Sequence, residues 1–202
     1  MHTTARGQKI VHWTDDQQVR LDDLAATPGS PIVKIGDEYI LRLEADIPFD
    51  ADAYFAKKGI DPDSIYKGDM TWRDEYNRQL QLQQAGMNSL TIGEWLQNVR
   101  DFTKRGRIMH GEQADAREDF LAGRSATEPI PPGPEDALHG PDQFPGGRPN
   151  RFDGLGDKGI NRSIGSRWKT RRQVITDSLD GILDEIAPDL RNFVHMNVRL
   201  HY

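Results

Sequence analysis

Alternating apolar and polar positions first appear near residue 32 and predict a small β-sheet. Residues 32–35 and 39–43 are rich in Ile, Val and Leu, and Gly36-Asp37 between them is typical of a hairpin turn. Near the C-terminus, residues 193–200 alternate again and contain β-branched side chains. We expect this last segment to pair with the N-terminal hairpin.

Helical periodicity begins at Thr71. From there the apolar residues recur every three or four positions, and Gly86 is expected to end the first long helix. Thr91, with Glu94 three residues later, forms a capping-box pattern that opens a second helix, and this helix is expected to end at Gly106. Further helices are expected over residues 51–59, 112–121 and 166–186.

Residues 123–165 show neither the alternation of a strand nor the periodicity of a helix. Seven of the chain's 12 prolines lie in this segment together with many glycines, but it also contains scattered aromatic and aliphatic residues. Long non-repetitive loops in compact domains are more often functional than idle. We therefore expect an ordered loop that forms the functional site.

These elements predict the α+β class. We expect a helix-rich single domain over residues 31–202, with a long Pro/Gly-rich site loop and a small, mostly antiparallel sheet that combines the N-terminal hairpin with the C-terminal strand. Residues 1–30 are polar and end in Thr27-Pro28-Gly29-Ser30. We interpret them as an N-terminal arm or as the remnant of a larger N-terminal region.

Composition excludes several kinds of site. The chain has no cysteine, so disulfides, thiolate metal sites and a cysteine nucleophile are excluded, and a bound metal would need oxygen or histidine ligands. It has no apolar run long enough for a transmembrane helix, and residues 1–9 lack the apolar core of a signal peptide. The net charge of −6 has the wrong sign for a nucleic-acid-binding protein, so any basic surface must be local.

Basic residues are concentrated between Lys158 and Arg172, where no acidic residue occurs. Glycines and hydroxyl side chains precede a helix expected to begin at Ser166, and the free N–H groups of a helix N-terminus favour phosphate. An ordinary glycine-rich loop with a serine cap is an equally good interpretation. The candidate nucleic-acid-binding residues are Lys158, Arg162, Ser163, Ser166, Arg167, Lys169, Arg171 and Arg172.

The sharpest local feature is His139-Gly140-Pro141-Asp142. A turn at Gly140-Pro141 can bring the imidazole and the carboxylate together, and phosphodiester hydrolysis needs a base near neutral pH and an anion that holds Mg²⁺. The spacing alone is unspecific, since an aspartate that orients a loop histidine gives the same pattern. His195 and His201 share a face of the C-terminal strand and are expected to be structural or exposed to solvent.

Four segments, in order, resemble the novel toxin 15 family of polymorphic bacterial toxins, whose members include type VI secretion DNase effectors. They are RQLQLQQAGMNSLT at 78–91; Glu94-Trp95-Leu96 with Arg100, Gly106 and Arg107; LHGPDQ at 138–143 followed by Gly146-Gly147; and GLGD at 154–157 with NRSIGSRW at 161–168. The third segment carries the HxxD signature of the family. The resemblance extends from Ile40 to the C-terminus, although Arg162 and Arg167 stand where small or neutral polar residues are expected.

The resemblance implies an antibacterial toxin that hydrolyses DNA as an endonuclease, with Mg²⁺ or another divalent cation. It makes His139 and Asp142 the essential catalytic pair, with Asp142 also as the metal ligand. It implies a cognate immunity protein, which we expect to cover the basic segment or the site with an acidic face, or to dock on the helices of residues 71–107. The toxin would be made in the producer's cytoplasm and secreted by the type VI system into the target cytoplasm, with a secretion adaptor or spike protein engaging a missing N-terminal region.

Two alternatives stay open at this point. An RNase would use the same residues, because nothing in the sequence marks a reader of the 2′-hydroxyl. A non-catalytic nucleic-acid-binding module would use the basic segment alone. No membrane partner is expected.

Overall fold

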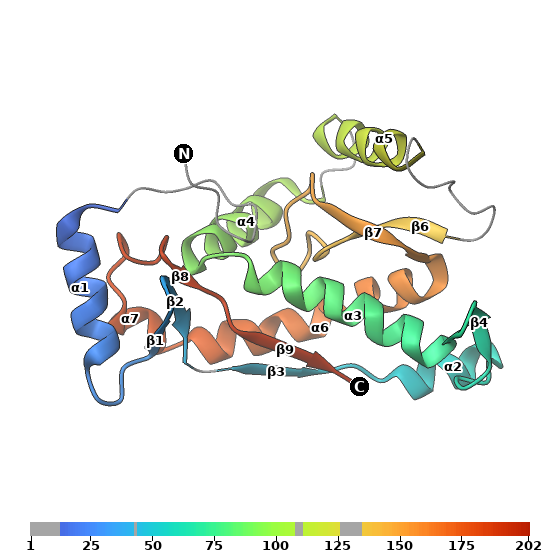
Figure 1. The fold of residues 1–202 in the computed structure, drawn as a ribbon, viewed down its shortest axis with the longest axis horizontal. Helices are drawn as coiled ribbons and strands as arrows, with labels where there is room; N and C mark the ends of the chain where they lie inside the picture. The colour runs from blue at the N-terminus through green and yellow to red at the C-terminus, as the bar shows by residue number, and fades with distance from the viewer. Residues whose placement is uncertain (1–12, 43, 108–110, 126–134) are drawn as a thin grey trace.

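The structure, a computed structural model, describes residues 13–42, 44–107, 111–125 and 135–202 (Figure 1). The helices are α1 (Asp15–Ala26), α2 (Ala51–Lys58), α3 (Trp72–Asn88), α4 (Ile92–Arg105), α5 (Glu112–Ser125), α6 (Lys158–Leu179) and α7 (Ile182–Glu185). The strands are β1 (Ile32–Ile35), β2 (Glu38–Leu41), β3 (Ala45–Pro48), β4 (Ile65–Lys67), β5 (Met70–Thr71), β6 (Glu135–His139), β7 (Phe152–Asp157), β8 (Val194–His195) and β9 (Val198–His201). The expected helix-rich α+β class is confirmed.

The N-terminal hairpin and the C-terminal segment associate as expected, with one difference in direction. β1 and β2 are antiparallel, with Gly36 at a φ of 60° in the turn between them. The C-terminal segment forms two short strands, and each joins in parallel: β8 pairs with β2, and β9 pairs with β3. The remaining pairs, β4 with β5 and β6 with β7, are antiparallel hairpins.

The core lies around α3, which runs through the middle of the molecule (Figure 1). Tyr76 and Leu80 of α3 are fully buried, and so is Trp168 of α6. The indole nitrogen of Trp168 donates to Gln83 at 2.6 Å, so the polar atom of this large side chain is also satisfied. α1 contributes Leu21 to the same core. Among the described residues, no helix is both long and apolar enough to cross a membrane.

Several predicted helix ends are wrong. The helix expected over residues 166–186 ends at Leu179, and the separate short α7 follows Gly181; the helix expected over 112–121 continues to Ser125.

Close packing or capping explains two further differences. α3 continues past Gly86 to Asn88. A Cβ at Gly86 would overlap the backbone of Gly140, so close packing explains why glycine stands here. The glycine therefore allows another segment to approach the helix and does not end it. α6 begins at Lys158 and not near Ser166, because the carboxylate of Asp157 caps it by accepting from the Ile160 N–H at 2.8 Å.

The predicted Pro/Gly-rich loop is largely regular structure where it is described. It contains the β6–β7 hairpin and the first two turns of α6, while residues 126–134 lie outside the described part of the chain. Only 140–151, between the two strands, forms an extended loop. This loop carries Asp142, and the strand before it ends at His139.

Candidate active site

His139 is the last residue of β6, and its ring nitrogens have different partners. Nδ1 lies 3.2 Å from the backbone oxygen of Arg151, which can only accept, so Nδ1 carries the proton of the neutral ring. Nε2 is then the unprotonated nitrogen, and it lies 2.6 Å from the side-chain nitrogen of Gln113. Gln113 also accepts from Gln143 at 3.1 Å, which fixes its amide with the nitrogen toward the imidazole. The network gives His139 the form of a general base at Nε2.

Burial keeps this imidazole neutral. Loss of solvent lowers the pKa of His139, and the nearby Arg107 acts in the same direction. The carboxylate of Asp142 opposes them and favours the charged ring. The ring is packed against Phe152, with centroids 4.3 Å apart. Since the lowering by burial is the largest effect, His139 is a proton acceptor at neutral pH.

Asp142 lies in the turn that follows β6, and its carboxylate is already engaged. Arg107 donates to both of its oxygens, at 2.6 and 2.8 Å, and the Phe144 N–H donates to Oδ1 at 2.9 Å. The Asp142 side chain is only 15% exposed, so this ion pair is partly shielded from water. Arg107 follows α4, which means that the end of that helix supplies the countercharge.

The donor set around Asp142 is small. In the part of the chain that the structure describes, no three His, Asp or Glu side chains converge as they would in a protein cage for a metal. Mg²⁺, however, is commonly held by one or two carboxylates, with water and substrate phosphate as its other ligands. Asp142, with Asp136 lining the same pocket, fits that mode of binding.

α3 and α4 hold the loop that carries Asp142. The absence of a side chain at Gly86 lets Gly140 lie directly on α3. The indole of Trp95 donates to the Pro145 oxygen at 2.7 Å, and Asn98 donates to the Gly146 oxygen at 2.8 Å. The loop is therefore ordered by side chains of two neighbouring helices.

A buried carboxylate attaches the β6–β7 hairpin to α3. Glu75 is 1% exposed and accepts from the side chains of Arg78 and Gln79 and from the Asp157 N–H, at 2.7–2.9 Å. Arg78 also donates to the Leu155 oxygen at 2.7 Å. A Cβ on Gly156 would lie only 2.6 Å from Glu75, so the strand needs glycine to approach this network. Arg78 and Gln79 open the RQL segment of the family resemblance, and their visible role is to position the hairpin.

His139 and Asp142 line one pocket of about 400 Å³, a size within the usual range for ligand sites. Three arginines also line it: Arg107, Arg117 and Arg162. Arg107, Gln113 and Arg117 were not among the predicted site residues. Arg107 stands in one of the family-like segments, so a signal for it existed, whereas α5 has too weak a pattern to mark Gln113 or Arg117. A second pocket, of about 510 Å³, lies between α4 and residues 188–192 and contains neither predicted catalytic residue.

The predicted nucleic-acid-binding residues all lie on α6, but they point to different faces of this helix. Arg162 and Ser166 line the pocket with His139, while Lys158 is half-buried and Lys169 is exposed. Arg172 lies over the ring of Phe144, at 4.7 Å. The structure thus brings only part of the basic segment to the pocket.

The other residues of this set form a separate row. Ser163, Arg167 and Arg171 follow one another at intervals of four, which places them on a common helix face. Arg167 donates to the Asp50 oxygen, and Arg171 donates to the Pro48 oxygen at 2.5 Å. Arg171 also lies 4.8 Å from the Phe49 ring, and burial lowers its pKa. These two arginines hold α6 against the end of β3 and the two residues that follow it.

The two C-terminal histidines lie outside the pocket. His195 is buried in β8, and its backbone pairs with Ile40 of β2. His201 ends β9, with Nε2 3.1 Å from a carboxylate oxygen of Asp46. Neither residue lines the pocket of His139.

Comparison with known proteins places the chain in a family. No curated protein matches it. The family model described as Novel toxin 15 matches residues 71–128 and 134–201, which together are more than half of the chain and include α3, α4, the β6–β7 hairpin and α6. The resemblance found in the sequence is thereby confirmed over these residues, and the match begins at residue 71 and not at Ile40. The chain belongs to the Novel toxin 15 family and is a polymorphic toxin domain.

Proposed function

We propose that this toxin is an endonuclease that hydrolyses phosphodiester bonds of DNA, with His139 as the general base. The observation that carries the proposal is the unprotonated Nε2 of a half-buried histidine in a pocket that Arg107, Arg117 and Arg162 also line. A base among several arginines suits an anionic substrate that is attacked by water.

The residues divide the chemistry among them. Nε2 of His139 takes a proton from the attacking water as the water oxygen bonds to phosphorus and the bond to the leaving oxygen breaks. The leaving oxygen takes its proton from solvent. The charge of Asp142 favours the imidazolium that forms, as its effect on the pKa of His139 indicates. The arginines of the pocket offset the charge that develops on the phosphate oxygens.

A divalent cation belongs to the same proposal. Asp142 would hold Mg²⁺, with Asp136 as the second carboxylate of the pocket. Such an ion, when bound, supplies positive charge at the phosphate. Arg107 now occupies both oxygens of Asp142, and its side chain is 39% exposed, so it is free to turn toward solvent or toward the phosphate when the cation binds.

The test is incubation of purified protein with supercoiled plasmid and with total RNA, each with and without EDTA. His139→Ala and Asp142→Ala should each reduce nicking at least about 100-fold, and EDTA should abolish nicking by the wild type. His201→Ala is the matched control, because His201 lies outside the pocket. Cleavage of RNA alone would make the protein an RNase, and binding without cleavage would make it a nucleic-acid-binding module. Full activity in either pocket variant, with the fold intact, would end the assignment.

Export and immunity complete the proposal. A DNase that its producer makes in the cytoplasm threatens the producer's own genome, so membership of a toxin family supports a cognate immunity protein as its partner. We place its action in the cytoplasm of a neighbouring bacterium, reached by the type VI system with the help of an adaptor or spike protein.

A further inference from the structure

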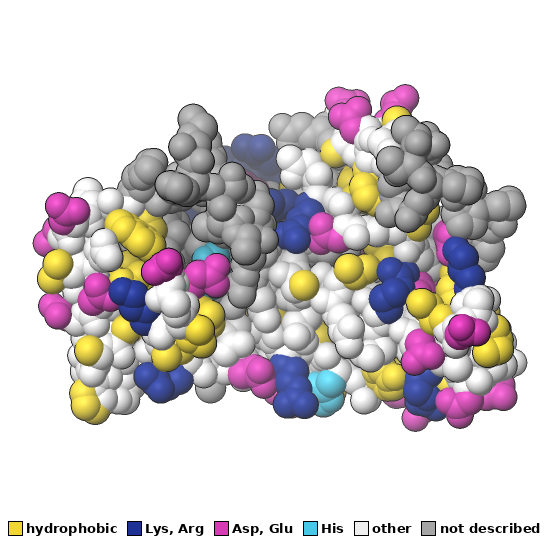
Figure 2. Space-filling view, viewed as in Figure 1, with side chains coloured by type: hydrophobic (Ala, Val, Ile, Leu, Met, Phe, Trp, Pro, Cys, Tyr) yellow, Lys and Arg dark blue, Asp and Glu magenta, His cyan; other side chains and the backbone are white. Residues whose placement is uncertain are grey.

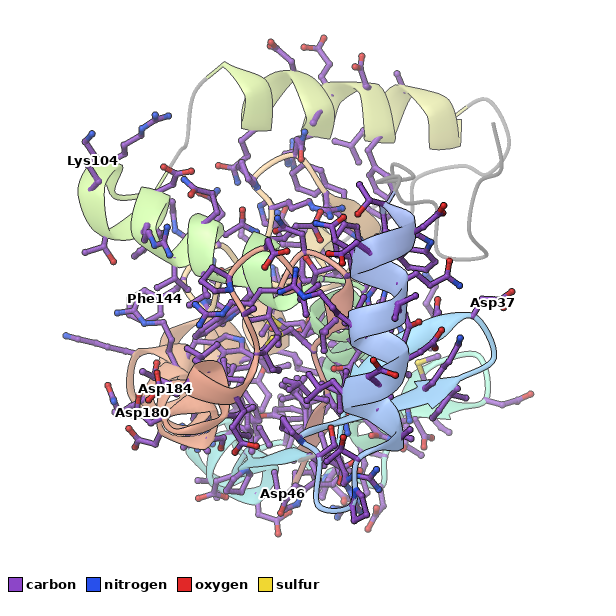
Figure 3. The ribbon with its side chains drawn as sticks, turned by 90° about the vertical axis from the view of Figure 1, so that its left-hand side faces the viewer. Asp37, Asp46, Lys104, Phe144, Asp180 and Asp184 are labelled. Atoms are coloured by element: carbon purple, nitrogen blue, oxygen red, sulfur yellow. The ribbon has the colours of Figure 1, made fainter. Side chains whose placement is uncertain are left out.

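α5 covers the candidate base and buries little of itself. It lies at the top of the molecule, above the β6–β7 hairpin (Figure 1), and it runs along the same upper edge in the turned view of Figure 3. None of its described side chains is buried, whereas α3, α4 and α6 each bury at least one tryptophan or tyrosine. A helix without buried side chains is held by few apolar contacts, so its detachment costs little.

The contacts of α5 with the hairpin come from one helix face. Gln113 meets Nε2 of His139 at 2.6 Å, Arg117 donates to Asp136 at 3.0 Å, and Phe120 lies 6.0 Å from the ring of Phe152. The first of these contacts occupies the nitrogen that must accept a proton from water. With α5 in this position, the base has no free lone pair.

The outer face of α5 has the wrong charge for the substrate. Asp115, Glu118 and Asp119 are exposed on it, and Figure 2 shows acidic side chains along the upper edge of the molecule, where Figure 1 places α5. Nucleic acid that approaches from this side meets carboxylates first, while Arg107 and Arg162 line the pocket that α5 closes on one side. Both the hydrogen bond and the charge oppose binding while α5 is in place.

We propose that α5 is a lid over His139, and that substrate reaches the pocket only when the lid moves off the hairpin. The inference rests on the proposed nuclease function for its biological meaning. The control of access to Nε2 of His139 by α5 can be measured without any nuclease activity.

The lid can be locked, because the natural chain has no cysteine. In Arg117→Cys/Asp136→Cys, a bis-maleimide with a two-carbon spacer links α5 to the hairpin where their ion pair now lies. The matched control is Asp22→Cys/Lys34→Cys, an ion pair between α1 and β1. Each protein is compared with its own unlinked form. Access to His139 is measured as its rate of carbethoxylation by diethylpyrocarbonate, at a pH where histidine is neutral, with peptide mass spectrometry to assign the site.

Linking α5 should slow modification of His139 at least about tenfold, because the rate follows the fraction of open molecules. The control link should leave the rate of modification of His139 unchanged. This rate is the readout, and not plasmid nicking, because Arg117 and Asp136 themselves line the pocket. Gln113→Ala should speed modification, since it uncovers Nε2 directly. Equal rates in linked and unlinked protein, or no effect of Gln113→Ala, would overturn the lid. A wild-type protein that cleaves no nucleic acid would refute the proposed function, and the modification rates would still decide the role of α5.

Discussion

Burial gives the imidazole of His139 a pKa below that of an exposed histidine, and this sets a pH dependence. In the proposed mechanism the neutral ring is the base, so cleavage should persist below the ordinary histidine pKa of about 6.5 and fall only when this partly buried ring protonates. Phe152→Ala, which opens the ring to water, should move the acidic limb of the pH–rate profile back toward that value. The pH–rate profile and an NMR titration of the imidazole measure both effects.

The same shift has a consequence for stability, and its sign follows from proton binding. The unfolded chain takes up the proton of His139 at a higher pH than the folded chain does, so between the two pKa values the unfolded state binds more protons. The free energy of unfolding therefore decreases as the pH falls below about 6.5, until the folded ring is also protonated. In a folded His139→Asn variant this part of the pH dependence should disappear. An unchanged pH dependence would show that the ring is exposed.

The close packing at Gly86 leads to a third prediction at the residue scale. Alanine is the better helix former by about 1 kcal/mol, but at Gly86 its Cβ would overlap the Gly140 backbone and lie 2.8 Å from the Pro141 ring. Overpacking against backbone costs about 1–3 kcal/mol, so Gly86→Ala should destabilise the protein in urea denaturation. Gly123 of α5 is the control, because nothing lies within 4 Å of the position that a Cβ would take there, and Gly123→Ala should be neutral or stabilising. Equal stability of the two variants would mean that the turn does not pack on α3.

The proposed catalytic pair, His139 and Asp142, could be named from sequence because its two residues are close in the chain and match a family signature. The partners of that pair could not. Arg151 offers a backbone oxygen to His139, and any residue type at that position would do so. Gln113 reaches Nε2 from a helix that is separate in sequence from the β6–β7 hairpin. Such contacts depend on tertiary packing, which no local pattern encodes.

The helical geometry of α6 decides which of its basic residues reach the pocket. In sequence its basic residues form one run, but 3.6 residues per turn send them to different faces. Arg162 is exposed and lines the pocket, whereas Arg171 is held by the Pro48 oxygen and the Phe49 ring. The run is thus part candidate substrate surface and part structural contact.

Salt-dependent DNA binding can separate these roles. In a His139→Ala background, which prevents cleavage, Arg162→Gln should weaken binding and flatten the slope of log K against log salt by about one unit. Arg171→Gln should leave the slope unchanged and lower the thermal stability instead, since it loses the contacts with Pro48 and Phe49. Equal slopes for wild type and Arg162→Gln would remove Arg162 from the interface.

The elements that could be predicted are those with strong local signals. The capping box at Thr91 is present, with Glu94 N–H donating to Thr91 at 3.2 Å, and α4 ends at Gly106 as expected. β7 was missed because it contains two glycines, and β6 because it begins with Glu135-Asp136 and has no β-branched residue; glycine, aspartate and glutamate are all depleted in strands. Here Gly156 lets β7 approach α3, a role that only the folded chain reveals.

At the scale of the whole molecule, charge is separated. The chain has 32 acidic and 26 basic residues, yet three arginines line one pocket. One of them, Arg117, belongs to α5, whose outer face carries acidic side chains. A protein of net charge −6 can therefore present a local basic surface at the pocket of His139. It also gives an inhibitor a surface to recognise.

We therefore predict an immunity protein that binds with an acidic face over the pocket of His139 or over α6. Charge complementarity would make its association fast and sensitive to salt. Co-expression of the toxin with the gene next to its own should protect the host, and the two proteins should co-purify. Arg162→Glu should slow association, while Arg199→Glu, a reversal of an exposed arginine on β9, should not. An inhibitor that binds α3 and α4 instead would be insensitive to both reversals, and host death at equal rates with and without the neighbouring gene would contradict the toxin–immunity pair.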